Sequence, residues 1–371
     1  MKNYWPACIT LFGLLLVSET QGQCSEKMDF ESYDPPSTLV VPEHKVTRAK
    51  FPFIDVHSHQ GNMTSPQALD QLLVDMEKLN MAVMVNLSGR GFRSGPDYLE
   101  KSLENIKKYQ PKRFVTFTNV DFGAIDDPQW QARTVKQLED DVKKGAQGLK
   151  IYKSLGMRDR DKDGKRIAID DPRIDPIWAK CGELGIPVLI HAADPKSFWS
   201  PMDSQNERWL ELKTHEGRQR SDTDPAPWEQ IIKEQHNMFK KHPKTKFINA
   251  HMGWYPNDLE KLGKLLDEMP NMYVEIGAVI AELGRQPRTA RNFMIKYQDR
   301  VMFGKDSWQP DEYTTYFRVL ETADEYFPYH KRYHAFWRMY GLELPDDVLK
   351  KIYYRNALKV IPGIDASQFP K

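Results

Sequence analysis

From Phe51 onward the chain alternates short apolar runs with longer stretches of mixed polarity. The apolar runs are rich in Val, Ile and Phe and lack polar alternation, which is typical of parallel strands buried on both faces. The intervening stretches have the length and pattern of helices. The predicted strands are Phe53–His57, Ala82–Leu87, Phe114–Asn119, Gly148–Tyr152, Val188–His191, Phe247–His251, Met272–Ile276 and Val301–Gly304.

The order strand, helix, strand repeats along this whole region. Eight strands that alternate with helices predict a (β/α)8 barrel, because eight is the number at which such a sheet closes. A doubly wound open sheet is the alternative. After the last strand we expect a closing helix at Asp311–Thr322, followed by a C-terminal appendage that ends in a helical segment, Asp346–Val360. The helices predicted between strands are Pro66–Leu79, Leu99–Tyr109, Thr134–Lys144, Pro176–Leu184, Trp228–Lys241, Asp258–Glu268 and Thr289–Lys296.

The N-terminal part of the chain differs from the rest. Residues 1–23 hold an apolar stretch that follows Lys2 and is too short to span a bilayer, so they predict a signal peptide and an exported protein. Residues 24–50 are polar and contain prolines, which predicts an extended lead-in to a barrel domain at 51–363. The residues before Cys24 lack the Leu and the small residue expected of a lipid anchor. We expect no transmembrane span once the signal is removed.

Composition narrows the range of partners. Lys and Arg total 53 against 52 Asp and Glu, with no strongly basic block, so the charge does not support nucleic-acid binding. The expected ligand is a small molecule, and a homodimer is left open. Cys181 lies in a helical pattern and is predicted to pack as a small apolar residue.

Four of the predicted strands deliver His or Asp at or just past their C-terminal ends. They are Phe53-Ile-Asp-Val-His-Ser-His59, Ile186-Pro-Val-Leu-Ile-His191, Phe247-Ile-Asn-Ala-His251 and Val301-Met-Phe-Gly-Lys-Asp306. In a barrel these ends meet at one face, where barrel enzymes carry their chemistry. Imidazole and carboxylate ligands suit Zn²⁺ and related ions, and the carboxylate brings Mn²⁺ into range. The pattern predicts a metal centre that holds a divalent ion, Zn²⁺ or Mn²⁺.

The same fragments, together with Tyr354-Arg-Asn-Ala-Leu-Lys-Val360, resemble the amidohydrolase superfamily, and most closely its amidohydrolase-related branch, which includes aminocarboxymuconate-semialdehyde decarboxylase. The resemblance spans roughly Phe51 to Pro362. It implies that His57, His59, His191 and Asp306 bind one metal ion with water at an open position. It also implies that His251 is the general acid or base beside that water, and that Asp306 takes part in proton transfer.

Three further residues are candidate substrate contacts. Lys150 ends the fourth strand, where it could attract a substrate carboxylate, become a carbamate that bridges two ions, or form a structural ion pair. Trp199 and His215 lie in a long loop, from Ala192 to about Pro227, above the fifth strand. Trp199 is predicted to be a wall of the substrate pocket, with pinning of the loop as the alternative. For His215 the alternative is a solvated side chain.

The other long loop, Lys153 to Asp175, contains the acidic stretch Asp159-Arg-Asp161-Lys-Asp163-Gly164 with Asp170 at the twelfth position. This spacing is similar to a calcium-binding EF-hand loop, in which helices flank the loop on both sides. Here a strand precedes it, so we interpret it as a charged turn and leave calcium binding open.

These observations predict a metal-dependent hydrolase that cleaves an amide, ester or lactone bond with a metal-activated water. A non-oxidative decarboxylase on the same metal centre is the alternative, and the predicted export favours hydrolysis. A binding protein without catalysis would not need all five metal-site residues. A phosphoesterase with three metals would need more His and Asp ligands than this chain supplies.

Overall fold

The computed structural model describes residues 29–90, 95 and 97–370. The predicted signal peptide and Cys24 therefore lie outside the described residues. Residues up to Val40 form one unit, in which the described part has a single 3-10 turn at Phe30–Ser32. The second unit begins at Val41 and contains all the other helices and strands described below. None of the described helices is both long and apolar enough to cross a membrane.

The strands of the second unit form a (β/α)8 barrel, as the sequence predicts. β1 pairs in parallel with β2, and β2 pairs in parallel with β3. The strands from β4 to β9 form a second run of parallel pairs in chain order. The strands are β1 (Phe53–Ser58), β2 (Met81–Asn86), β3 (Phe114–Thr116), β4 (Thr118–Asn119), β5 (Leu149–Ile151), β6 (Val188–Ile190), β7 (Phe247–Asn249), β8 (Met272–Glu275) and β9 (Val301–Met302).

The third predicted strand is divided at Phe117 into β3 and β4. The Phe117 N–H donates to Asn86 on one side, and the Thr118 N–H donates to Gly148 on the other, so the hydrogen-bond partner changes between these two residues. The ring closes where the chain beyond β9 meets β1. There the Val56 N–H donates to Phe303 O at 3.0 Å, and the Asp306 N–H donates to His57 O at 2.7 Å. The second of these bonds places two predicted metal ligands side by side.

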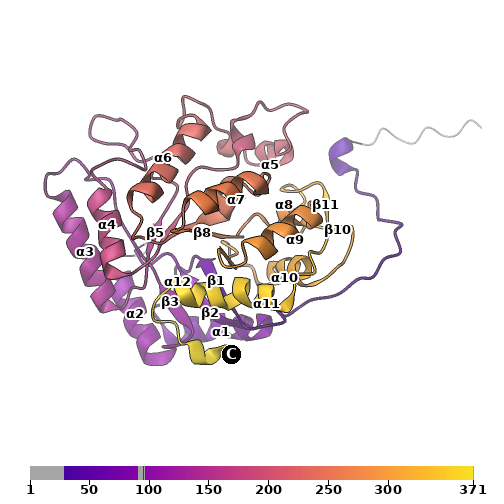
Figure 1. The fold of residues 1–371 in the computed structure, drawn as a ribbon, viewed down its shortest axis with the longest axis horizontal. Coiled ribbons are helices and arrows are strands. Elements are labelled where there is room, and N and C mark those ends of the chain that lie inside the picture. The colour runs from indigo at the N-terminus through magenta and orange to yellow at the C-terminus, as the bar shows by residue number, and fades with distance from the viewer. Residues whose placement is uncertain (1–28, 91–94, 96, 371) are drawn as a thin grey trace, which may run out of the picture. The chain divides into compact units, whose positions relative to one another are not determined.

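Helices surround the strands, and α3 and α4 lie next to each other on the outside (Figure 1). Most begin within one or two residues of the predicted position, whereas α3 begins four residues before it. The helices are α1 (Pro66–Leu79), α2 (Tyr98–Tyr109), α3 (Trp130–Lys144), α4 (Asp175–Leu184), α5 (Trp209–Thr214), α6 (Trp228–Lys241), α7 (Leu259–Glu268), α8 (Ile280–Gly284), α9 (Pro287–Lys296), α10 (Tyr313–Glu321), α11 (Asp346–Lys350) and α12 (Asn356–Val360).

Local sequence explains the ends of α1. The Ser65 hydroxyl accepts from the Ala68 N–H, which caps the first turn, and Pro66 occupies the first helical position, where a missing N–H costs nothing. Asn80 ends the helix in the left-handed conformation with φ of 69°. Asn is one of the few residues other than Gly that adopt this conformation readily.

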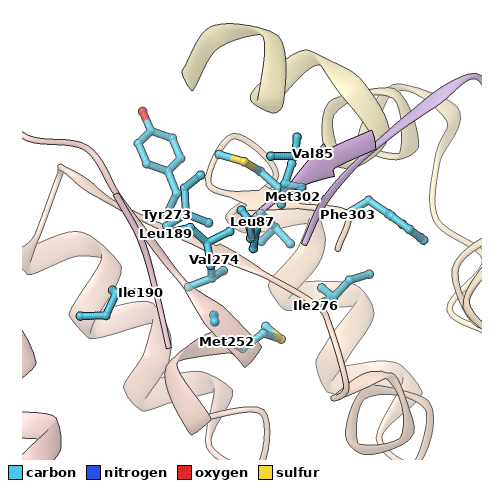
Figure 2. Packing of buried hydrophobic residues seen from close by; sticks show 14 of the residues in the cluster. Val85, Leu87, Leu189, Ile190, Met252, Tyr273, Val274, Ile276, Met302 and Phe303 are labelled. Carbon is cyan, nitrogen blue, oxygen red and sulfur yellow. The ribbon is translucent and has the colours of Figure 1, made fainter. Parts of the chain in front are cut away.

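Buried apolar side chains of the strands and of the surrounding helices form one continuous core. Every residue of β1 is buried, and the same is true of every residue in the strands β3 to β9. Figure 2 shows part of this core, in which Leu87, Leu189, Val274 and Met302 come from four separate places along the chain. Continuous burial of both strand faces accounts for the unbroken apolar runs in the sequence.

The C-terminal segment packs against β1 and β9. It comprises α11, a π-helical turn at Lys351–Arg355, and α12, where the sequence predicted one helical segment. The Asn356 side chain donates to Val301 O at 2.7 Å, and the Phe303 N–H donates to Ile352 O at 2.9 Å. A short antiparallel pair, β10 (Phe327–Pro328) with β11 (Arg338–Met339), precedes this segment and was not predicted.

The acidic stretch in the loop after β5 forms a hairpin turn. Arg160 and Arg166 are paired in antiparallel fashion, and the Asp161 carboxylate accepts the backbone N–H groups of Asp163 and Lys165 at 3.1 and 2.9 Å. These hydrogen bonds belong to the charged turn that the sequence predicts.

Candidate metal centre

The five residues predicted to form the metal centre lie at or just beyond the C-terminal ends of strands. His57 is in β1 and His59 follows it, His191 follows β6, His251 lies in the turn after β7, and Asp306 follows β9. Barrel enzymes place their active sites at this face. The ring geometry therefore brings together residues that are up to 249 positions apart in the sequence.

The Nε2 atom of His57 lies next to the carboxylate of Asp306. Its Nδ1 lies 3.0 Å from Glu275 Oε1, and a carboxylate there fixes the hydrogen on Nδ1. Nε2 then presents a lone pair to Asp306 Oδ1 at 3.2 Å. Two acceptors repel each other at this distance unless a proton or a metal ion lies between them. Burial and Lys150 lower the pKa of His57, but the charges of Asp306 and Glu275 outweigh them, so the pKa is raised.

His59 approaches the same carboxylate oxygen from another side. Its Nδ1 lies 2.9 Å from the Ser88 hydroxyl, and its Nε2 lies 3.5 Å from Asp306 Oδ1. Burial opposes ionisation of Asp306, but His57, His251 and His59 outweigh it and hold the pKa of this carboxyl well below its usual range. Asp306 is therefore an anion toward which two imidazole nitrogens converge.

His251 and His191 form the other half of the cluster. His251 Nδ1 lies 2.7 Å from the Gly277 carbonyl oxygen, so it carries the hydrogen, and Nε2 lies 3.2 Å from His191 Nδ1. His191 Nε2 is buried and has no hydrogen-bond partner among the described residues. Burial lowers the pKa of both rings, which keeps them neutral at pH 7. A neutral imidazole nitrogen without a partner is available as a metal ligand.

One set of side chains meets the geometric requirement for a shared ion most closely. Ligand atoms of His57, His251 and Asp306 all lie within 4.8 Å of one another, and no second such group of His, Cys, Asp or Glu occurs in the described part of the chain. His59 and His191 lie directly beside this group. The donors are imidazoles and one carboxylate, which suit Zn²⁺ or Mn²⁺. The residues present therefore fit a divalent metal.

Glu275, at the end of β8, is a central residue that sequence reasoning missed. Oε1 accepts from His57 Nδ1 and from the His251 backbone N–H at 2.7 Å, and Oε2 accepts from the Gly277 N–H at 2.5 Å. Burial alone would raise the pKa of this carboxyl, but His57 and His251 lower it to about 2. A side chain on Gly304 would come within 2.4 Å of Oε2. The sequence did contain one indication of this role, a glutamate within the otherwise apolar strand Met272–Ile276, because a buried carboxylate needs hydrogen-bond or ion-pair partners.

The turn that carries His251 is strained. His251, Met252, Gly253 and Trp254 all have positive φ, between 53° and 60°. Residues other than glycine adopt this conformation at a cost of about 1–2 kcal/mol each, and such outliers cluster at functional sites. The Trp254 indole N–H donates to Ala192 O at 2.8 Å, and its ring centroid lies 4.7 Å from that of His251. The turn holds the His251 imidazole between Trp254 and the Gly277 carbonyl.

Lys150 lies in β5 and is almost completely buried. Its Nζ is 3.5 Å from His57 Nε2 and 5.7 Å from the centre of the Tyr152 ring. Burial lowers its pKa to about 8, although Asp306 and Glu275 oppose the shift. No ion pair involves Lys150 in the described chain. Lys150 does not line the cavity described next, so its attraction of a substrate carboxylate stays a prediction.

A cavity of about 260 Å³ opens above these residues. His191, His251, Trp254 and Asp306 line its floor, and side chains from the long loop after β6 and from the segment around β10 line its walls. Phe198 is one of the lining residues, whereas its neighbour Trp199 and the ring of His215 are not. The Trp199 indole N–H donates to Ala226 O at 2.9 Å, and the His215 ring contacts Tyr333, which does line the cavity. The predicted substrate contacts of Trp199 and His215 remain predictions.

The model of the amidohydrolase family matches residues 54–363. The chain belongs to this family. The match covers the whole barrel and confirms the resemblance that the four strand-end motifs indicate. Comparison of this amidohydrolase with curated proteins gives no significant match.

Solved structures with the same fold include two decarboxylases and a hydratase. The chain is 15% identical to 2,6-dihydroxybenzoate decarboxylase, with a TM-score of 0.51 over 84% of this chain and 99% of the other. The chain is 15% identical to 4-oxalomesaconate hydratase from Rhodopseudomonas palustris, with a TM-score of 0.50 over 85% of this chain and 97% of the other. It is 14% identical to 5-carboxyvanillate decarboxylase from Sphingomonas paucimobilis, with a TM-score of 0.50 over 84% of this chain and 99% of the other. At these identities the likeness shows the fold.

The role of Glu275 is testable by removal of its charge. We expect Glu275→Gln to bind a divalent metal about 10–100-fold more weakly, because loss of this outer carboxylate releases the tautomer and orientation of His57. Titration with Zn²⁺ against a competing chelator measures the effect. Glu260→Gln, an exposed carboxylate on α7, is the control and should bind like the wild type. Unchanged metal affinity in Glu275→Gln would contradict this assignment.

Substitution of Trp199 and of its neighbour Phe198 distinguishes a residue that packs the loop from one that contacts substrate. If Trp199 pins the loop through Ala226, Trp199→Ala lowers the melting temperature by a few degrees and leaves KM unchanged. Phe198→Ala, which removes a lining side chain, should raise KM. A raised KM in Trp199→Ala with an unchanged melting temperature would instead establish Trp199 as the predicted pocket wall.

Proposed function

We propose that this amidohydrolase is a metal-dependent hydrolase that cleaves an amide, ester or lactone bond of a small molecule. The observation that carries the proposal is the fixed orientation of His251. Because Nδ1 donates to the Gly277 carbonyl oxygen at 2.7 Å, the Nε2 lone pair points toward His191 and the Asp306 side of the cluster. A neutral imidazole in this position accepts a proton from an attacking water, which is the first requirement of hydrolysis.

The proposed metal ligands are His57, His59, His191 and Asp306. His251 would act beside the ion, although its own ligand atom also lies within 4.8 Å of those of His57 and Asp306. When bound, a divalent ion would supply a water of lowered pKa and would polarise the bond to be cleaved. His251 Nε2 takes the proton and returns it to the leaving group, while Gly277 and Glu275 hold the ring and backbone in place. Lys150 provides a positive charge that would attract a substrate carboxylate.

A decarboxylase is the second candidate, and Lys150 is the observation that favours it. A buried cation 3.5 Å from His57 Nε2 could help to anchor a carboxylate at the same centre. Loss of CO₂ then requires that a carbon atom receives a proton, and His251 or Asp306 would have to deliver it. Two structures that share the fold are named as decarboxylases, but at 14–15% identity their reactions do not transfer to this chain.

The metal and the division of roles are tested together. We expect about one Zn²⁺ or Mn²⁺ per chain, and we expect its removal by a chelator to abolish activity. His57→Ala and His191→Ala should lose metal and activity together. His251→Asn should keep its metal and lose activity by roughly two to four orders of magnitude, the usual contribution of a general acid–base group. A metal-free His251→Asn protein would show that His251 is a ligand, in agreement with its place beside His57 and Asp306.

The reaction itself is tested with matched substrates. The loaded enzyme is assayed against lactones, esters and amides, with acid release as the readout, and against hydroxylated aromatic carboxylates, with CO₂ release as the readout. Hydrolysis of at least one bond type, lost in His251→Asn, is the expected result. CO₂ release without any hydrolysis would replace the first candidate by the second.

A further inference from the structure

A second cavity, of about 210 Å³, adjoins the metal cavity. The two share Pro195 and Trp254 in their linings. One side of Trp254 lies close to His191 and His251, with ring centroids 5.6 and 4.7 Å away. The second cavity is bounded by the long loop after β6, by α7 and by α8, so it is distinct from the ligand cluster itself.

At one wall of this cavity a buried carboxylate has an unused acceptor. Glu282 in α8 is completely buried, and its Oε1 is paired with the guanidinium of Arg208. Its Oε2 has no hydrogen-bond partner in the described chain. A buried carboxylate oxygen without a donor costs about 1–3 kcal/mol or more. An O–H or N–H group of a bound molecule would remove this cost.

The other walls supply aromatic surface and a free cation. Trp228, Trp254 and Tyr255 line the cavity, which suits a flat ring. Lys261 in α7 also lines it, with its Nζ 4.9 Å from the centre of the Tyr255 ring. Lys261 has no ion-pair partner among the described residues, whereas Lys196 is paired with Glu229. In the described chain, the Lys261 ammonium group therefore has no carboxylate partner, and Glu282 Oε2 has no hydrogen-bond donor.

We propose that this cavity is a second small-molecule site, and that it takes a single-ring aromatic acid with a hydroxyl or amine donor. The ring lies among Trp228, Trp254 and Tyr255, the donor group reaches Glu282 Oε2, and the acid group pairs with Lys261. The cavity volume of about 210 Å³ suits one ring.

Direct binding tests the proposal without any enzymatic assay. The probe is 4-hydroxyphenylacetate, titrated into the full chain with tryptophan fluorescence and calorimetry as readouts, and phenylacetate is the matched probe without the donor. We expect saturable binding of the first and roughly tenfold weaker binding of the second, from the loss of one hydrogen bond to a charged group. Protein stripped of metal should bind the probe equally well. Binding that disappears with the metal would place the probe in the metal cavity and overturn the proposal.

Variants locate the site. Lys261→Met, on the surface of α7, should weaken probe binding by about tenfold, and Lys264→Met, on the same helix and paired with Glu260, should not change it. Ser197→Trp should fill the cavity and abolish binding. Glu282→Gln should weaken binding as well, and the surface variants keep the test valid if loss of its pairing with Arg208 prevents folding. The proposal fails if the wild type shows no saturable binding of the probe, or if Lys261→Met and Ser197→Trp both bind it normally.

Discussion

The carboxylate of Glu275 is the constraint on which the metal centre depends. One buried side chain at the end of β8 accepts N–H groups from His57 in β1, from the His251 backbone after β7, and from Gly277 in its own strand extension. A buried negative charge is stable only when it is compensated by such donors. The three segments must therefore converge on Glu275, and this convergence fixes the tautomer of His57 and the start of the turn that carries His251.

The left-handed turn from His251 to Trp254 shows what this constraint achieves. The positive φ values of its three non-glycine residues cost about 1–2 kcal/mol each. A hydrogen bond to a charged acceptor contributes about 1.5–3 kcal/mol, and the His251 N–H makes one to Glu275. The indole bond of Trp254 to Ala192 and the burial of Met252 act in the same direction. An ordinary helical turn would aim the His251 ring elsewhere, so the strain is the cost of its orientation.

Both faces of the barrel strands are buried, so each strand appears in the sequence as a continuous apolar run. The barrel could be predicted for this reason. The sequence also predicted which side chains gather at one face, since each follows such a run directly. The break at Phe117 was not predictable, because Phe114–Asn119 reads as one strand and only its two neighbours reveal the change of partner. The role of Glu275 was hidden for a related reason. Its bond to His57 joins residues 218 positions apart, and no local pattern reports such a contact.

The choice of reaction belongs to a different part of the molecule from the choice of metal. Strand ends supply the metal donors, and these follow from the barrel and from Glu275. The cavity walls come instead from the loop after β6 and from the segment around β10. Surface loops in general tolerate sequence change better than the strands that they connect. Hydrolysis and decarboxylation differ in which atom receives a proton, and under either proposal the cavity wall would orient the substrate toward His251. The strand-end motifs therefore leave undetermined the side chains that would discriminate between the two proposed reactions.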